Sequence, residues 1–328
     1  GADQLGVATL QESLDLRETL ELRGTGATLL AWLWHPDEGL ELEAAVASGV
    51  QLGIPSEEHL EAAIAAGRRA RVVPKITVMA DTGLNRSGIQ VLGGAFRRAM
   101  PALADAHARG EAQVTGVFSH LACADEPGHE SIDMQAGRFR EAAELLAEAG
   151  VGKQLNHLAN SPAALTRPDL AFDMVRPGLA VYGLEPVSGR DHGLRAAMRW
   201  EARIPLVKPL RKGEAVSYGR TWTADRDTTI ALIPCGYADG MLRSASGKFE
   251  VAVNGVRYPQ VGRVCMDQFV VDLGPDAPVR AGDVAVIVGN RPGEPTADEL
   301  AAAAGTINYE ILTAPRGRTR RRHIGGEC

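Results

Sequence analysis

The chain has 328 residues, of which 45% are hydrophobic and 23% are charged, a balance typical of a folded globular protein. Its 35 basic and 41 acidic side chains give a formal net charge of −6, which argues against a nucleic-acid or membrane-surface role. The longest apolar run, residues 27–34, is far shorter than the roughly 18 residues of a membrane-spanning helix. The start has no signal-peptide pattern and the four cysteines are thinly spread, so we expect a reducing, cytoplasmic location.

The first 185 residues or so alternate short apolar runs with longer segments of helical periodicity. The expected strands are Gln4–Thr9, Ala27–Trp34, Gln51–Ile54, Val72–Ala80, Thr115–Leu121, Gln154–Leu158 and Asp173–Tyr182. The expected helices are Leu10–Arg23, Asp37–Ser48, Ser56–Arg68, Gly93–Ala108, Gln135–Ala149 and a short one around Pro162–Leu165. Seven successive strand–helix units predict an α/β fold, a TIM-like (β/α)8 barrel whose first βα unit is absent in this chain.

Turn and cap residues support several of these boundaries. Ser56 is a suitable N-cap, and Gly110 and Gly150 stand where helices commonly end. Thr296 with Glu299 forms a capping-box pattern for a final helix, residues 296–304.

The pattern changes after about residue 190. A short helix is expected at His192–Met198, and then β-runs at Ala202–Leu210, Glu214–Ser217, Thr228–Pro234, Phe249–Val253, Phe269–Leu273 and Val284–Val288. The Asn254-Gly255 pair predicts a hairpin, so we expect the chain after about residue 190 to form a mostly antiparallel β domain. We expect a barrel domain over residues 1–195 and a β domain over 196–328, with the basic tail Arg316–His323 as a solvated face.

Polar residues follow four successive strands of the predicted barrel. They are Arg86, His120, His157 with Ser161, and Arg176. Each alone could be a turn residue or a core histidine. Function in βα barrels lies at the carboxyl ends of the strands, so together they favour a site for an anion-bearing ligand.

Three further segments contain candidate functional residues, and each of them can also be explained as an ordinary structural feature. Ser161 and the main chain at Gly178-Leu179 could hold a phosphate, or could be a helix cap and a turn. The segment GYADG at 236–240 could expose a tyrosine, or be an ordinary turn. The segment GRVCMDQ at 262–268 could be a strand edge with alternating faces.

These segments together resemble the bacterial alanine racemase family, which uses pyridoxal 5′-phosphate (PLP). The matching stretches are DTGLNRSG at 81–88, FSHLACAD at 118–125, HLANSPA at 157–163, MVRPGLAVYGL at 174–184, VSYGRTW at 216–222, GYADG at 236–240, VGRVCMDQF at 261–269 and INYE at 307–310. They follow the family's order over essentially the whole chain. GYADG combined with VCMDQ distinguishes this family from the barrel-type PLP decarboxylases.

The resemblance implies a cofactor site. Arg176 would face the pyridine nitrogen of PLP, oriented by His157, with His120 in the hydrogen-bond network near the ring. The phosphate-binding residues would be Ser161, Gly178, Leu179 and Tyr309.

The resemblance also implies a two-base racemisation of alanine, with no metal ion. Tyr237 would be one base and Arg86 would bind the substrate carboxylate. Met266 and Asp267 would join Tyr237 from the second subunit of a homodimer. The product, D-alanine, would serve peptidoglycan synthesis in the cell wall.

The sequence departs from the family at two places. The family's PLP-binding lysine lies in a VKA(N/D)xYGHG motif that is absent here, so we expect this chain to lack the N-terminal unit that carries it. Met79 stands where the family usually has a lysine. Two alternatives therefore stay open: a non-catalytic homologue that binds PLP or only dimerises, and a racemase for another small amino acid such as serine.

Overall fold

The computed structural model describes residues 1–152 and 154–325. The chain forms two compact units. Unit 1 comprises Gly1–Gly178 and Pro186–His192, and unit 2 comprises Leu179–Glu185 and Gly193–Cys328. The domain boundary expected from the sequence, with residues 1–195 in one domain and 196–328 in the other, stays a prediction.

Unit 1 is built on a parallel sheet. Its main strands, in spatial order, are β1 (Gln4–Val7), β2 (Thr28–Ala31), β3 (Gln51–Ile54), β4 (Lys75–Asp81) and β6 (Gln113–Phe118). The short β5 (Ile89–Gln90) also pairs with β4. Beyond β6 the barrel order continues as isolated bridges, Phe118 with His157 and Asn160 with Arg176. The expected barrel-like α/β architecture is confirmed.

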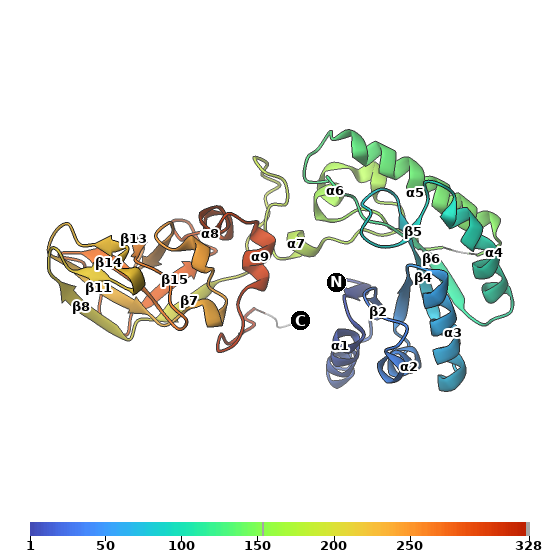
Figure 1. Ribbon diagram of the computed structural model, residues 1–328, viewed down its shortest axis with the longest axis horizontal. Helices are drawn as coiled ribbons and strands as arrows, with labels where there is room; N and C mark the ends of the chain where they lie inside the picture. Colours follow the sequence, from blue (N-terminus) through green and yellow to red (C-terminus); the bar gives the residue numbers. More distant parts are fainter. Residues whose placement is uncertain (153, 326–328) are drawn as a thin grey trace. The chain divides into compact units, whose positions relative to one another are not determined.

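Helices alternate with these strands and pack on one side of the sheet (Figure 1). They are α1 (Leu10–Leu22), α2 (Gly39–Ala47), α3 (Glu57–Ala70), α4 (Ala95–Ala108), α5 (Glu130–Glu148) and α6 (Ser161–Thr166). The short α7 (Gly178–Val181) begins where the chain passes from unit 1 to unit 2, and its Leu179 packs in the core of unit 2. Buried Leu, Ile, Val, Ala and Phe side chains form one continuous core between sheet and helices. The predicted caps hold: Ser56 accepts from the His59 N–H, and Gly110 and Gly150 follow helix ends with positive φ.

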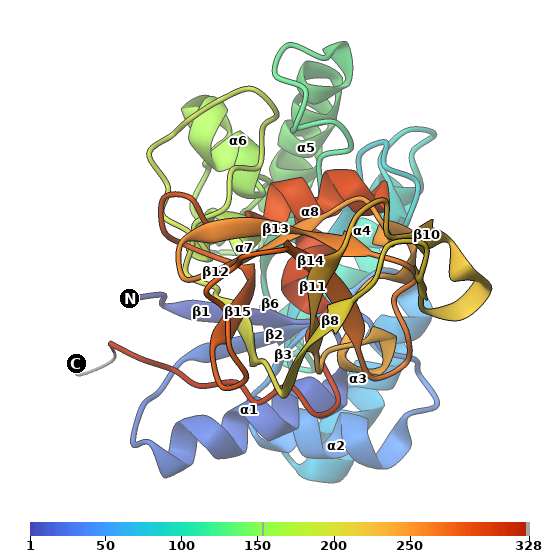
Figure 2. The ribbon, with the colours of Figure 1, turned by 90° about the vertical axis from the view of Figure 1, so that its left-hand side faces the viewer.

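Unit 2 is dominated by a seven-stranded antiparallel sheet, visible in Figure 2. Its spatial order is β7 (Trp200–Arg203), β15 (Val284–Val288), β12 (Glu250–Val253), β13 (Val256–Val261), β14 (Phe269–Gly274), β11 (Thr228–Ile233) and β8 (Leu206–Leu210). A small sheet pairs β9 (Ala215–Val216) with β10 (Trp222–Thr223), and α8 (Ala297–Ala304) and α9 (Asn308–Thr313) complete the unit. Asn254 and Gly255 both have positive φ, which confirms the predicted two-residue hairpin between β12 and β13.

Four predicted elements were wrong. The single β-run expected at Ala202–Leu210 is divided into β7 and β8, which lie at opposite edges of the large sheet. Residues 192–198 are not helical, and Gly193 within this stretch has a φ of +71°, which a right-handed helix does not allow. The strand expected at 173–182 is reduced to the bridge at Arg176, since Pro177 lacks an N–H and α7 begins at Gly178. The strand expected at 154–158 is likewise reduced to the bridge at His157.

No helix among the described residues combines the length and the apolar character needed to cross a membrane.

Candidate functional site

Arg176 is the centre of a cluster at the carboxyl ends of the unit 1 strands. Its Nη1 donates to the main-chain oxygen of His157 at 2.9 Å and lies 2.8 Å from His157 Nδ1. Its Nη2 donates to the main-chain oxygens of Ser119 at 2.6 Å and Leu158 at 3.1 Å, and lies 3.5 Å from His120 Nδ1. Carbonyls and imidazoles from two adjacent strand ends therefore fix the plane of the guanidinium.

The two imidazoles beside Arg176 are neutral at pH 7. Burial and then the charge of Arg176 lower the pKa of His157 to about 3. Burial, followed by the charges of Arg176 and Arg86, lowers the pKa of His120 to about 4. Burial also lowers the pKa of Arg176 to about 10, so the guanidinium stays protonated at pH 7.

Packing fixes the orientation of His157. Its ring stacks on that of Phe118, with ring centroids 5.1 Å apart and planes within 4° of parallel. The Arg176 guanidinium carbon lies 5.8 Å from the centre of the same Phe118 ring, a favourable cation–π position. Because His157 Nδ1 faces a donor, we assign the ring proton to Nε2.

The predicted phosphate-binding residues of unit 1 lie on segments next to Arg176. The bridge between Asn160 and Arg176 places the start of α6 beside the main chain of Arg176. Asn160, not Ser161, caps this helix by accepting from the Ala163 N–H at 3.3 Å. Ser161 is buried at the first helical position, and Gly178 begins α7 two residues after Arg176.

The segment that carries Arg86 is shaped by Asp81 at the end of β4. The buried Asp81 carboxylate accepts from the Gly83 and Asn85 N–H groups, both at 3.0 Å. Arg86 is exposed, and its charge reaches His120 strongly enough to lower that pKa. Met79 is buried within β4, with its sulfur close to Gly53 of β3, so an apolar contact occupies this position.

Unit 2 brings together Tyr237, Met266 and Asp267, which the sequence separates by about thirty residues. The Tyr237 N–H donates to the Cys265 oxygen at 3.1 Å, and the Ala238 N–H donates to the Met266 oxygen at 2.9 Å. The two segments approach so closely that a Cβ at Gly236 would lie 2.2 Å from the Met266 oxygen. The predicted tyrosine is accessible, with 37% of its surface exposed.

A buried carboxylate organises this pair of segments. Asp239, 4% exposed, accepts from the Gly236 N–H at 3.0 Å and from Arg318 through both oxygens at 2.9 Å. Arg318 Nη2 also lies 2.8 Å from Asp267 Oδ1. Neither Asp239 nor Arg318 is among the site residues predicted from the sequence. The sequence predicts that the tail 316–323 is a solvated face. The Arg318 side chain is indeed exposed, but it also forms ion pairs with Asp239 and Asp267.

The other two predicted cofactor residues also belong to unit 2. Leu179 is buried in the core of that unit, which leaves its main chain as the group able to bind a ligand. Tyr309 lies on α9 with 40% of its surface exposed.

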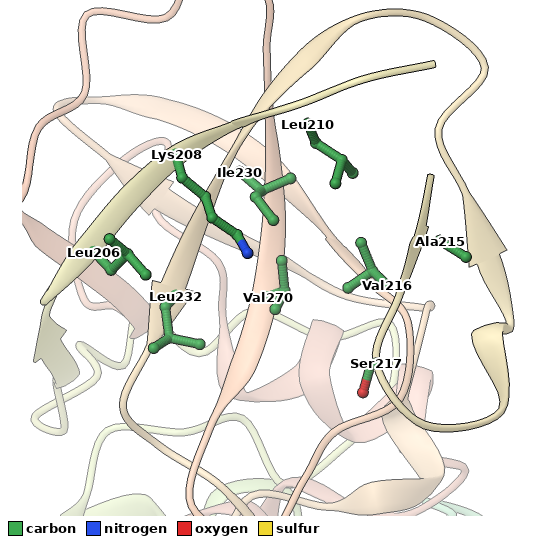
Figure 3. A pocket seen from close by; sticks show the side chains of 9 residues that line it. All are labelled: Leu206, Lys208, Leu210, Ala215, Val216, Ser217, Ile230, Leu232 and Val270. Atoms are coloured by element: carbon green, nitrogen blue, oxygen red, sulfur yellow. The ribbon is translucent and has the colours of Figure 1, made fainter. Parts of the chain in front are cut away.

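Unit 2 also contains an apolar cavity of about 330 Å³ on one face of its large sheet (Figure 3). Its lining residues are Leu206, Lys208, Leu210, Ala215, Val216, Ser217, Ile230, Leu232 and Val270. None of the predicted site residues lines this cavity, so it is separate from the candidate site.

The fold and the site define a class: proteins with a barrel-like α/β unit, an antiparallel β unit and a cluster centred on an arginine at the barrel strand ends. Comparison of the sequence with models of protein families identifies the family within this class. Residues 1–186 match the model described as "Alanine racemase, N-terminal domain", and residues 197–323 match "Alanine racemase, C-terminal domain". The chain therefore belongs to the alanine racemase family, a family of isomerases, as the resemblance implied.

Individual relatives agree. The chain is 50% identical over 335 residues to an alanine racemase of Mycolicibacterium vanbaalenii, covering 100% of this chain and 83% of the relative. An alanine racemase of Salinispora arenicola is 51% identical over 314 residues, covering 95% and 82% respectively.

Solved structures agree as well. The crystal structure of alanine racemase from Streptomyces lavendulae matches with a TM-score of 0.92 at 43% identity, covering 99% of this chain and 84% of that one. Alanine racemase from Streptomyces coelicolor gives a TM-score of 0.93 at 42% identity, covering 99% and 85%.

Proposed function

We propose that the protein carrying these residues is an alanine racemase that interconverts L- and D-alanine in the cytoplasm with PLP as cofactor, supplying D-alanine for peptidoglycan. We further propose that it acts as a homodimer whose subunits share each active site. The observation that carries this proposal is the Arg176 cluster: a protonated guanidinium held by neutral groups at the strand ends of a chain of this family.

The residues present fit PLP. Arg176 stays protonated at pH 7, and with PLP bound its charge would disfavour protonation of a pyridine nitrogen placed next to it. His157 orients the Arg176 guanidinium through its Nδ1, and His120 lies next to the other guanidinium nitrogen. Ser161, with the main chain at Gly178 and neighbouring Leu179, and Tyr309 would hold the phosphate. Bound PLP supplies an electron sink that acidifies the α-proton of an amino acid.

The remaining site residues handle the substrate. Arg86 binds the carboxylate of alanine, for which a forked, permanently charged donor is suited. Tyr237 exchanges a proton with one face of the substrate α-carbon. In the proposed dimer Tyr237, Met266 and Asp267 come from the other subunit.

The second base is not assigned among these residues. The family's lysine motif has no counterpart in the sequence shown. Lys75, the one described lysine of unit 1, begins β4 and so lies at the opposite end of the strand from Asp81.

The test uses the protein expressed from its own gene. D-alanine formed from L-alanine, and the reverse, is measured by chiral chromatography, with serine as an alternative substrate. Borohydride reduction followed by intact mass measurement reports covalently bound PLP. We expect alanine racemisation and one PLP per chain. Bound PLP without turnover of alanine would overturn the proposed function in favour of a binding protein or a different racemase.

Tyr237→Phe tests the role of the phenol. We expect it to reduce racemisation by at least about 100-fold, the usual contribution of a positioned acid–base group. Tyr258→Phe removes the same atom from a buried tyrosine of β13 and is the matched control. Full activity of Tyr237→Phe in both directions would refute its assignment as a base.

A further inference from the structure

Gln135 on α5 is a polar side chain with no exposed surface. Its Nε2 donates to Thr82 Oγ1 at 3.1 Å and to the main-chain oxygen of His120 at 3.0 Å. Its Oε1 accepts from the Ala122 N–H at 2.9 Å. Both donors and the acceptor of one amide are therefore used, and all three bonds go to loops rather than to the helix itself.

The bonds of Gln135 join two strand ends. Thr82 directly follows β4, whereas His120 and Ala122 lie in the segment after β6. The two loops also meet directly, since Thr82 Oγ1 and Ser119 Oγ lie 2.8 Å apart. One helical turn further along α5, Arg138 donates to the Thr82 oxygen at 3.0 Å. Helix α5 thus fixes both loops against each other.

The loop after β6 also supplies two of the contacts that orient the Arg176 guanidinium. The Ser119 oxygen accepts the shortest of the Arg176 hydrogen bonds, and His120 Nδ1 faces Nη2. We propose that Gln135 is a positioning residue, which sets the Ser119 carbonyl and the His120 ring against Arg176 and thereby fixes the guanidinium toward the cofactor. This inference rests on the proposed function and adds a residue that touches neither cofactor nor substrate.

Packing alone does not account for this residue. Burying an amide costs free energy unless each polar atom is bonded, and the three bonds that meet this cost for Gln135 all go to the two loops. Removing the amide leaves the His120 carbonyl and the Ala122 N–H without these partners, so the loop that carries His120 loses its fixed position.

Gln135→Met is the first variant, because methionine has a similar length and no hydrogen-bonding amide. Its matched control is Gln51→Met. Gln51 is also buried and bonds to Thr77 and Thr115, near the amino ends of β3, β4 and β6, away from the Arg176 cluster.

Three readouts are taken on each protein. Amide hydrogen exchange measures protection of residues 119–124. Exchange at the imidazole C2 position, followed by mass spectrometry, gives the pKa of His120. Titration with PLP gives the cofactor affinity, and kcat and KM are measured alongside.

For Gln135→Met we expect faster exchange at 119–124 and a His120 pKa that moves from about 4 toward the ordinary 6.5. We also expect PLP affinity to fall by about 10- to 100-fold, as when groups that orient a ligand-binding side chain are removed. Gln51→Met should change none of these. Wild-type His120 titration and PLP affinity in Gln135→Met, or equal changes in Gln51→Met, would overturn the proposal.

If Gln135→Met does not fold, a second pair of variants tests whether Gln135 positions the loop that carries His120. Thr82→Val removes one of the two acceptors of Gln135 with little change in shape, whereas Thr82→Ser keeps the hydroxyl. We expect a smaller shift of the same kind in the valine variant and none in the serine variant. Exchange and His120 titration need no turnover, so an inactive wild-type protein would refute the proposed function without deciding the role of Gln135.

Discussion

His157 makes the folded state of unit 1 sensitive to acid. Its pKa is about 3 in the folded chain, because of burial first and the Arg176 charge second, against about 6.5 for an exposed histidine. Below about pH 6.5 the unfolded chain therefore binds a proton that the folded chain does not. The free energy of unfolding falls as the pH is lowered from about 6.5 toward about 3, while above about pH 7 this imidazole contributes no pH dependence.

The size of the effect follows from the width of that window. Each pH unit within it costs about 1.4 kcal/mol, so His157 lowers the free energy of unfolding by about 2 kcal/mol between pH 7.5 and pH 5. His157→Asn removes the titrating group and keeps an acceptor close to the position of Nδ1. We expect the variant to lose about 2 kcal/mol less than the wild type over the same range.

Urea unfolding at several pH values measures this difference. With Trp200 and Trp222 of unit 2 replaced by Phe in both proteins, tryptophan fluorescence reports on unit 1, where Trp34 is buried and donates to the Gly53 oxygen at 3.0 Å. Between pH 7.5 and 8.5 the offset between the two proteins should be constant, which is the internal control. An equal loss of stability in both proteins between pH 7.5 and 5 would refute the assignment of a buried, neutral His157.

Two further predictions concern the backbone and unit 2. Gly116→Ala should lower the free energy of unfolding by about 2–4 kcal/mol, since its φ is +155° and a Cβ would lie 2.3 Å from the Leu155 oxygen. Gly137→Ala, at an open helical position of α5, should raise it by about 0.5–1 kcal/mol, and thermal melting compares the two. Asp239→Asn weakens the charged bonds to Arg318 and should destabilise unit 2 by about 2 kcal/mol with faster amide exchange at 236–240. Unchanged exchange there would show that Asp239 does not hold the Tyr237 segment.

Much of the fold could be predicted because local signals and tertiary structure agree. The caps at Ser56 and Thr296 and the hairpin at Asn254-Gly255 depend on a few neighbouring residues, and all are confirmed. The errors lie where the local signal is weak. The segment after Met174 is apolar enough for a strand, yet Pro177 interrupts its pairing.

The site was predictable only in so far as strand order predicts proximity. Parallel strands place their carboxyl ends at one edge, which is why His120, His157 and Arg176 could be grouped from sequence. Gln135 and Arg318 gave no such signal. Helical periodicity shows that Gln135 faces inward but not what it contacts, and Arg318 meets Asp239 across 79 residues of sequence.

The neutrality of the groups around Arg176 is the feature that best explains this site. A buried cation is usually paired with a carboxylate, because removing its hydration costs several kcal/mol. Here carbonyl oxygens and two imidazoles with depressed pKa values orient the guanidinium without cancelling its charge. The positive charge therefore remains available to an electron-rich ring atom or an anionic group, with Arg86 adding a second charge near His120. An acidic partner would orient the guanidinium but also neutralise it, whereas these carbonyl and imidazole partners orient it and leave its charge in place.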